Sequence, residues 1–412
     1  MPDGTDIAVV GTGLAGLSAA LALAARGVPL TLIGPRPDAG VRSRDTRSTA
    51  LFGPSLALLE RTGVMRRLRD APTPLSGLRL IDRSGGWVTA PEVLFKSSEI
   101  GIDAFGWNFE NATLLAALAD AADDSGGISW LDANVDRISR DDGVTVATSD
   151  GVIRSFRLVV GADGANSTCR SASGVSTQQW SYPQTAIATR FAHARPHDTI
   201  STELHRRAGP LTTVPLPGRR SSLVWVDRPE VAAGLMALDD AGFAAALERE
   251  LGGALGPISD VGPRAAFPLS GLTAEPIAAR RIALVGEAAH RLPPIGAQGL
   301  NLGLRDAAWL ADFVADAVGD GGDPGANDVL DAYCRARRGD VASRTLAVDL
   351  LNRSLIADLL PFDMARAGGL TALSAVGPLR QLFMRQGMAP AGPLPSLMQV
   401  STEDRACGAP AA

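Results

Sequence analysis

The sequence has few of the residues that form metal centres and disulfide frameworks, with three cysteines and four histidines among 412 residues. Cys169, Cys334 and Cys407 are far apart and odd in number, so they indicate no disulfide pattern and favour a reducing, cytoplasmic setting. His193 and His197 have the spacing of helical metal ligands, but a proline lies between them. The sequence therefore predicts no metal site.

A basic excess and a long apolar run are also missing. The formal net charge is -5 and the arginines and lysines are scattered, which excludes the basic surface typical of nucleic-acid-binding proteins. No segment reaches about 18 consecutive apolar residues, so no transmembrane helix is expected. The apolar stretch 7–25 follows Asp3 and Asp6 and contains three glycines, which is unlike a signal peptide.

Apolar residues do make up 46% of the chain, which suffices for a large core, and the length favours two joined domains. Apolar runs and their glycine or proline breaks predict an α/β arrangement that a β-rich segment at about 176–275 interrupts. The main strands are expected at 6–11, 28–33, 143–148, 152–161 and 281–286, and a hairpin within 76–95. Helices are expected at 14–26, 112–123, 240–251, 298–318 and within 328–388, where Pro361 would break them.

A glycine-rich loop follows the first strand. Gly11, Gly13 and Gly16 form the pattern GxGxxG, in which the first glycine allows a tight turn, the second admits a pyrophosphate and the third lets helix and strand pack. Free N–H groups at the start of the helix would face the phosphate charge. The carboxylate that normally ends the second strand and binds the ribose is replaced by Gly34, with Arg36 nearby, an arrangement that suits a 2′-phosphate. The loop therefore predicts a dinucleotide but leaves FAD and NADP open.

Two later strands each end in a glycine beside a carboxylate. The segment 158–164 ends in Asp163 and Gly164, and the segment 282–287 ends in Gly286 and Glu287. The second segment continues into a glycine- and proline-rich stretch, 293–306, that opens a long helix. Each strand therefore presents a carboxylate and a flexible backbone at the same kind of turn.

In this order, the glycine-rich loop and these two turns resemble the class A FAD-dependent monooxygenases, and the likeness extends from residue 6 to about 398. Within that family the chain looks most like the ubiquinone-biosynthesis hydroxylases, through segments 45–51, 108–118, 209–225 and 384–398. The resemblance implies an α/β fold with a Rossmann-like FAD-binding domain in three parts, 1–75, 99–175 and 279–325. It also implies a β-sheet substrate domain at 76–98 and 176–278, a C-terminal helical region at 326–398 and a poorly ordered tail at 399–412.

The resemblance further implies tightly bound FAD. The implied cofactor contacts are Gly11, Gly13, Leu14, Ala15, Gly16, Arg47, Asn111, Val135, Asp163, Gly164, Gly286, Glu287, Gly296, Gln298, Gly299, Leu300 and Asn301. Pro293 and Gly296 would lie near the isoalloxazine ring. Two positions depart from the family pattern: Gly34 replaces an acidic residue, and Glu287 replaces an aspartate while keeping the carboxylate.

By resemblance, the chain inserts one oxygen atom of O2 into a phenolic ring through a flavin C(4a)-hydroperoxide, with a polyprenyl phenol of ubiquinone biosynthesis as the substrate. NAD(P)H or a ferredoxin-type donor would supply the electrons, and other quinone-biosynthesis enzymes are expected partners. A long isoprenoid tail needs an apolar route from the membrane, so peripheral contact at its inner face is expected. The helix at 298–318 would direct its positive end at the flavin and stabilise the anionic reduced form.

Other interpretations stay open. A hydroxylase of a small soluble phenol or an aromatic acid would share every FAD motif, and an acid would need a cation such as Arg190 or Arg206. Prenyl reductases and halogenases share the fold. The departures at Gly34 and Glu287 also suit an FAD-binding, non-catalytic scaffold of a quinone-making complex.

Three further side chains have two interpretations each. His290 either packs behind the second carboxylate turn or transfers a proton. Trp225 and Phe267 either belong to the core of the β-rich domain or line a pocket. The sequence favours packing for all three and names no general base.

Overall fold

The computed structural model describes residues 6–38, 45–85, 90–140, 143–356, 360–388 and 392–399, with the backbone alone for 355, 356 and 360–367. Cys407 and the predicted tail, apart from residue 399, lie outside the described residues.

A six-stranded sheet forms the first layer, in the order β19-β20-β12-β1-β2-β8. Its parallel members are β1 (Ile7–Val10), β2 (Leu30–Ile33), β8 (Ile128–Leu131), β12 (Leu158–Gly161) and β20 (Ile282–Leu284), and β19 (Ala278–Ala279) pairs antiparallel at one edge. Strands β1, β2, β12 and β20 are buried along their whole length, which explains their continuous apolar runs. The βαβ unit predicted at the N-terminus is confirmed.

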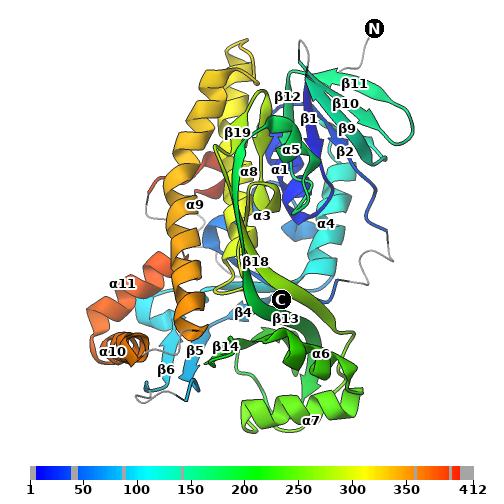
Figure 1. Ribbon diagram of the computed structural model, residues 1–412. Coiled ribbons are helices and arrows are strands. Elements are labelled where there is room, and N and C mark those ends of the chain that lie inside the picture. The colour runs from blue at the N-terminus through cyan, green and yellow to red at the C-terminus, as the bar shows by residue number, and fades with distance from the viewer. Residues whose placement is uncertain are drawn as a thin grey trace.

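Helices and a small sheet cover this layer. The helices α1 (Leu14–Ala25), α4 (Asn111–Asp123) and α8 (Gln298–Gly319) pack together, and α3 (Gly53–Arg61) lies beside α1 and α8. The short helix α5 (Thr168–Ser173) packs instead on β12 and β20. The meander of β9 (Val135–Arg140), β10 (Val144–Thr148) and β11 (Ile153–Phe156) lies at the upper right in Figure 1. Val144, Val146 and Phe156 of this meander join the main core, so both faces of the parallel sheet are covered.

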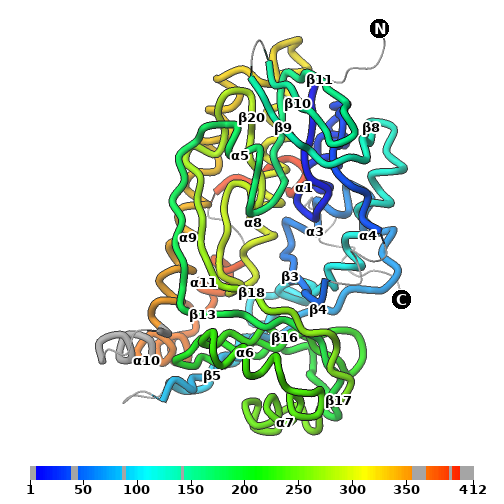
Figure 2. The backbone as a smooth tube through the Cα atoms, turned by 45° about the vertical axis from the view of Figure 1, so that its right-hand side comes forward, coloured from blue at the N-terminus to red at the C-terminus, as the bar shows by residue number. Residues whose placement is uncertain are grey.

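The second layer is a nine-stranded mixed sheet in the order β21-β18-β13-β16-β15-β14-β5-β6, with β17 beside β13. Its strands are β5 (Gly77–Asp82), β6 (Val93–Lys96), β13 (Ser176–His193), β14 (Ile200–His205), β15 (Leu211–Leu216), β16 (Arg220–Asp227), β17 (Ile258–Ser259), β18 (Ala265–Glu275) and β21 (His290–Arg291). The predicted pairing of β5 with β6 is confirmed. Strand β14 pairs in parallel with β5, although residues 77–82 and 200–205 are about 120 positions apart in sequence. The long strands β13 and β18 run together from the parallel sheet down into this layer (Figure 2).

Two helices cover the outer face of the nine-stranded sheet. They are α6 (Pro229–Ala237), which the sequence pattern did not predict, and α7 (Asp240–Leu251), which it predicted with the same bounds. Phe243 and Leu247 of α7 pack against Trp225 and Ile187 of the sheet in a second core.

A three-stranded sheet connects the layers, in the order β3 (Ser48–Phe52), β7 (Gly106–Glu110), β4 (Thr73–Leu75). Single turns of 3-10 helix occur at η1 (Met65–Arg67), η2 (Ser97–Ile100), η3 (Gly286–Ala288) and η4 (Ser396–Met398).

The C-terminal helices are α9 (Asn327–Ile356), α10 (Leu360–Ala375) and α11 (Gly377–Met388). Helix α9 runs down the left side of the molecule in Figure 1 and reaches α10 and α11 at the lower left. Leu370 of α10 and Met384 of α11 pack on Leu80 and Phe95 of the β5–β6 hairpin. The break predicted at Pro361 falls at the start of α10. None of the helices in the described part of the chain is both long and apolar enough to cross a membrane.

A Rossmann-like layer, a separate β-sheet layer and C-terminal helices together confirm the predicted fold class. The boundaries drawn between the domains stay a prediction, since β13 and β18 continue unbroken past the parallel sheet.

Candidate active site

Three predicted turns meet at one edge of the parallel sheet. Gly11 follows β1, Asp163 follows β12 and Gly286 follows β20, and these strands are neighbours. Parallel neighbours end at the same edge, so the turns lie side by side. Arg170 joins two of them, because its Nη1 donates to the carbonyl oxygen of Ala288 at 3.0 Å and its Nη2 to that of Ala165 at 2.7 Å.

The glycine-rich loop has the shape that a pyrophosphate needs. A Cβ on Gly11 would lie 2.3 Å from the carbonyl oxygen of Ala162, and one on Gly16 would lie 1.9 Å from that of Gly11, so neither position admits a side chain. Gly13 has open space around it and begins α1 with no capping side chain. The first N–H groups of α1 are therefore open to an anionic group, which fits the pyrophosphate of FAD.

The start of α8 is similarly open. Gly296 and Ala297 have φ angles of 64° and 54°, and Ala297 precedes the helix without a capping side chain. The first N–H groups of the helix, from Gln298 onward, have no partner within the helix itself. The predicted start of this helix is confirmed at Gln298.

Asn301 has a different role from the one that the resemblance implies for its side chain. Its Oδ1 accepts from the N–H of Phe52 at 3.1 Å and from Ser55 Oγ at 2.7 Å. Its Nδ2 donates to the carbonyl oxygens of Ala50 and Ala297, both at 2.8 Å. These four bonds occupy the amide and connect β3 and α3 to the start of α8. Only the backbone of Asn301 is therefore available to contact a cofactor.

Arg47 and Asn111, predicted from separate segments, meet on Asp45. The Asp45 carboxylate accepts from the backbone N–H of Arg47 at 3.0 Å, from its Nε at 2.9 Å, from its Nη2 at 2.8 Å and from Asn111 Nδ2 at 3.2 Å. Thr49 Oγ1 donates to Asn111 Oδ1 at 2.7 Å. Sequence reasoning missed Asp45 as a functional residue, although the carboxylate two residues before Arg47 was a usable signal.

The electrostatics of this Arg47 cluster (Asp45, Arg47, Thr49 and Asn111) point to Glu287. Burial works to raise the pKa of Asp45, but its bonds to Arg47 outweigh that effect and lower the pKa. The bond to Asp45 raises the pKa of Arg47, and the charge of Glu287 acts in the same direction. Glu287, at the end of β20, is therefore close enough to Arg47 to interact with it.

Phe267 lies on the same side of the site. The guanidinium carbon of Arg47 is 5.5 Å from the centre of the Phe267 ring, which is 39% exposed. A ring this exposed is not part of a packed core, which leaves its face open to a bound group.

The departure at Gly34 has a steric cause. Gly34 has a φ of 151°, and a Cβ there would lie 2.8 Å from Thr12 Cγ2 in the glycine-rich loop, so an acidic residue would need both a strained backbone and a shift of the Thr12 side chain. Arg36 turns to other partners: its guanidinium carbon is 4.3 Å from the centre of the Trp130 ring, and it forms an ion pair with Asp123. Arg36 is thus already engaged, which disfavours a 2′-phosphate and hence NADP at this loop.

Comparison with known proteins agrees with this geometry. The FAD binding domain family model matches residues 4–348. The ubiquinone hydroxylase UbiL of Rhodospirillum rubrum is 37% identical over 387 residues, with 93% of this chain and 89% of that protein covered. This chain belongs to the FAD-binding monooxygenases.

Other similar proteins align with this monooxygenase over almost its whole length. The 3-demethoxyubiquinol 3-hydroxylase of Escherichia coli is 29% identical, with 93% of this chain and 98% of that protein covered. Among solved structures, p-nitrophenol 4-monooxygenase PnpA from Pseudomonas putida matches with a TM-score of 0.74 at 19% identity, over 94% of this chain and 99% of that one. PqsL from Pseudomonas aeruginosa, a probable FAD-dependent monooxygenase, matches with a TM-score of 0.73 at 21% identity, over 90% and 100%. The structural matches show the shared fold.

Behind the Gly286–Glu287 turn, the monooxygenase has a fully buried charge network. Asp306 accepts from His290 Nε2 at 2.6 Å, from Arg337 Nε at 2.7 Å and from the N–H of Gly286 at 3.1 Å. Arg337 Nη1 continues to Asp340 at 2.7 Å. Burial works to raise the pKa of Asp306, but the charges of His290 and Arg337 outweigh it and hold the pKa below its ordinary value. The His290 ring thus supports the turn from behind.

The arginines considered for an acidic substrate already have partners in the monooxygenase. Arg190 forms an ion pair with Glu110. Arg206 contacts Asp227 at 3.1 Å and Glu250 at 3.4 Å. Neither guanidinium is thus an isolated cation that awaits a substrate carboxylate.

Trp225 does not line the site. It pairs with Leu211 and Ile187 across the sheet and packs in the outer core, with its ring 5.9 Å from that of Phe243. The core interpretation favoured by the sequence is confirmed for Trp225. Phe267, 39% exposed and beside Arg47, is not a core residue, so the core interpretation is wrong for it.

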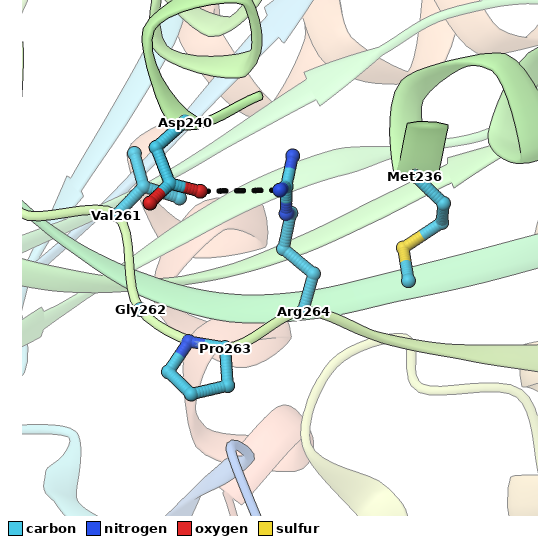
Figure 3. Close-up of a pocket in the computed structure, with 6 residues that line it drawn as sticks. All are labelled: Met236, Asp240, Val261, Gly262, Pro263 and Arg264. Atoms are coloured by element: carbon cyan, nitrogen blue, oxygen red, sulfur yellow. Dashed lines mark hydrogen bonds and ion pairs between the residues drawn. The ribbon is translucent and has the colours of Figure 1, made fainter. Parts of the chain in front are cut away.

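Two surface pockets are lined by residues other than those predicted to bind FAD, although Glu110 of the second directly precedes Asn111. A pocket of about 440 Å³ on the outer side of the second layer is lined by Met236, Asp240, Val261, Gly262, Pro263 and Arg264, and the Arg264–Asp240 ion pair of 3.1 Å crosses it (Figure 3). A smaller one, of about 170 Å³, lies where β7 meets the β15–β16 hairpin and is lined in part by Asn108, Glu110 and Pro217. Neither contains a residue predicted to bind FAD, so neither marks the flavin site.

Proposed function

We propose that this FAD-dependent monooxygenase hydroxylates the ring of a polyprenyl phenol in ubiquinone biosynthesis. The observation that carries the proposal is the nearly full-length match, at 37% identity, to a protein named ubiquinone hydroxylase. The E. coli relative is likewise named for hydroxylation of a ubiquinol precursor. In this proposal the Arg47 cluster, Glu287 and Phe267 would surround the reacting part of the site, and their mutual contacts support it.

The residues present fit FAD. Gly11, Gly13 and Gly16 with the start of α1 would hold the pyrophosphate, and Leu14, Ala15, Val135, Asp163 and Gly164 would line the ADP part. Arg47, Asn111, Gly286 and Glu287 would hold the ribityl chain, and Pro293, Gly296, Gln298, Gly299, Leu300 and the Asn301 backbone would surround the ring. Bound FAD supplies the activation of O2, and the protein supplies position and a dry surrounding. The particular flavin–oxygen route stays a prediction.

The start of α8 has an electrostatic role in this proposal. Its N–H groups carry a partial positive charge, which would stabilise negative charge on the pyrimidine edge of the reduced flavin. The glycines at 296 and 299 leave the backbone accessible there, since a Cβ on either would meet no backbone atom within 4 Å.

A phenol without a carboxylate fits better than an aromatic acid. Arg190 and Arg206, the candidate cations, are committed to Glu110 and to Asp227 with Glu250. Freeing either one would leave buried or half-buried carboxylates without their partner, which destabilises the protein. We therefore rank small aromatic acids below phenols as candidate substrates.

We propose NAD(P)H as the electron donor, with a ferredoxin-type donor as the alternative. The experiment is to reconstitute the purified protein with FAD and measure O2 uptake with NADPH, with and without 2-geranylphenol. Uptake stimulated by the phenol, with a hydroxylated product, supports the proposal. Bound FAD with no stimulated uptake, even when a reduced ferredoxin replaces NADPH, would favour the non-catalytic scaffold.

We propose that the end of the substrate route that faces the membrane lies at α11. Val376, Leu379, Leu382 and Phe383 form an outward stripe whose members are 43–53% exposed. From Met364 to Thr402 the sequence has three arginines and no acidic residue, unlike the acidic chain as a whole. An apolar stripe in an acid-free segment suits the surface of an anionic membrane. Cosedimentation with phosphatidylglycerol vesicles that Leu382→Asp and Phe383→Asp abolish would support this contact, and equal sedimentation of the variant would exclude it.

A further inference from the structure

A buried acid–histidine pair lies on β14 and has no part in the flavin site described above. The Nε2 atom of His205 is 2.7 Å from Oε1 of Glu203. The two side chains are only 5% and 9% exposed. Titratable groups buried to this extent are rare unless they serve a structural network or a ligand.

The pair points to the inner face of the nine-stranded sheet. Leu204, between the two residues, packs in the outer core with Leu211 and Trp225. Because side chains alternate along a strand, Glu203 and His205 point the other way. The polar atoms of the pair therefore lie on the inner face.

The same face carries the Arg47 cluster. Glu203 pairs with Thr212, Thr212 with Val224 and Val224 with Ala188, across β14, β15, β16 and β13. Thr46, between Asp45 and Arg47, donates its hydroxyl to the carbonyl oxygen of Ala188 at 3.2 Å. Three strand spacings separate Glu203 from this contact, on the order of 15 Å along the sheet.

The pair also lies next to the C-terminal helices. Glu203 pairs with Leu80 of β5, and Leu80 packs in a core with Leu370 of α10 and Met384 of α11. The inner face between these helices and the Arg47 cluster is partly open, since Thr212, Val214 and Val224 are only half-buried. The pair thus borders the surface between the proposed membrane side and the flavin site.

One nitrogen of His205 is unused. Nδ1 is buried and has no hydrogen-bond partner among the residues that the structure describes. Since Glu203 accepts a hydrogen bond from Nε2, that nitrogen carries the proton and Nδ1 is left as an acceptor. A buried acceptor without a partner destabilises the fold, which a ligand hydroxyl in the site would relieve.

We propose that His205 Nδ1 binds the ring hydroxyl of the phenolic substrate and takes its proton, with Glu203 as the positioning residue. The phenol O–H bond breaks, the proton moves to Nδ1, and the electron pair stays on oxygen as the phenolate. The Nε2–H group of the imidazolium remains bonded to Glu203, which stabilises its charge. The phenolate has a more electron-rich ring, which is the ring that an electrophilic oxygen attacks. This inference rests on the proposed function.

The test compares a phenol with its deoxy analogue. The dissociation constants of 2-geranylphenol and geranylbenzene are measured from the change in flavin absorbance of the FAD-loaded protein. A site built for a hydroxyl rejects a ligand that lacks it, so we expect the phenol to bind at least about tenfold more tightly. In His205→Phe this ratio should fall to about 1, while FAD content stays unchanged.

Two polar variants separate binding from proton transfer. His205→Gln keeps a hydrogen-bonding group but no base, so the phenol should still be preferred while the hydroxylation rate falls by about 100-fold or more. Glu203→Gln keeps the volume and should lower the rate by a smaller factor. His193→Gln is the matched control: His193 is equally buried on the same sheet, but both of its nitrogens have partners, Arg195 and Ser221, and its change should leave the binding ratio unaltered.

The outcomes are distinguishable. A ratio near 1 in the wild type, or an unchanged ratio in His205→Phe, overturns the inference. The inference is also overturned if the wild type hydroxylates 2-geranylphenol and none of the three variants, His205→Phe, His205→Gln and Glu203→Gln, lowers the rate. That result leaves the proposed function intact. A wild type that hydroxylates no phenol with either donor defeats the proposed function itself.

Discussion

Two clusters of arginine and carboxylate stand on either side of the Gly286–Glu287 turn, and they differ in burial. In one, Asp306 and Arg337 are fully enclosed, with side chains 0% and 1% exposed. In the other, Asp45 and Arg47 are 21% and 49% exposed. An arginine–carboxylate pair thus stabilises the fold in the cluster from which water is excluded. In the exposed cluster the same pair of residue types faces the proposed cofactor. Burial, more than residue type, separates the structural role from the functional one.

The largest effect is expected in the buried cluster. Asp306→Ala removes the carboxylate that His290 and Arg337 share and leaves the buried Arg337 guanidinium with Asp340 as its remaining charged partner. Breaking a buried pair in this way costs about 3–5 kcal/mol, so the free energy of unfolding of the apoprotein should fall by that amount. Urea unfolding measures it. Asp323→Ala, which removes a partly exposed partner of Arg281, should cost much less; equal losses would contradict the comparison.

The open cluster should show the opposite pattern. Arg47→Ala should weaken FAD binding about 10- to 100-fold, because hydrogen bonds to charged groups contribute roughly 1.5–3 kcal/mol each. The stability of the apoprotein should hardly change. FAD titration followed by fluorescence quenching checks this. Arg157→Ala is a matched control, since Arg157 is similarly exposed but lies before β12, at the opposite edge of the sheet.

A smaller effect is expected from Asp45→Asn. The amide keeps the volume but loses the charge that orients Arg47 and Asn111 together. FAD affinity should fall about tenfold, in the range of a single charged hydrogen bond. In the Arg47→Ala background the same change should add little, because the two residues act as a unit. Additive losses in the double variant would show that Asp45 acts independently of Arg47.

The smallest effect is expected in the pH dependence of stability at acidic pH. The pKa of Asp306 is lower in the folded protein than its ordinary value of 3.8. A lowered carboxylate pKa stabilises the fold above the unfolded pKa, and this stabilisation is lost as the pH falls from about 4 through the folded pKa. Unfolding free energies measured between about pH 6 and pH 3 should therefore fall more steeply in the wild type than in Asp306→Asn. Parallel profiles would contradict a charged Asp306.

Local patterns explain which parts of the site could be predicted. Gly11, Asp163 and Gly286 each end a strand that can be recognised from a few apolar residues, and parallel strands bring such ends together. The start of α8 at Gln298 follows from the prolines and Gly296 before it. These features depend on neighbours in sequence.

The parts that could not be predicted depend on distant partners. Arg190 looks free until Glu110, 80 residues away, forms an ion pair with it, and Asn301 is consumed by bonds to residues about 250 positions earlier. The inward direction of Glu203 and His205 follows only once the register of β14 is known. Trp225 and Phe267 look alike in sequence but fall on opposite sides of the sheet, because they pair with the adjacent residues Ile187 and Ala186 of β13.

The most direct test of the account follows one oxygen atom. The FAD-loaded protein is incubated with NADPH, 2-geranylphenol and ¹⁸O2, and the product is analysed by mass spectrometry. The account predicts a phenol that gains one hydroxyl, with the label in the product and the second oxygen atom in water. An unlabelled product, or consumption of ¹⁸O2 to peroxide with no hydroxylated phenol under any donor, would contradict it.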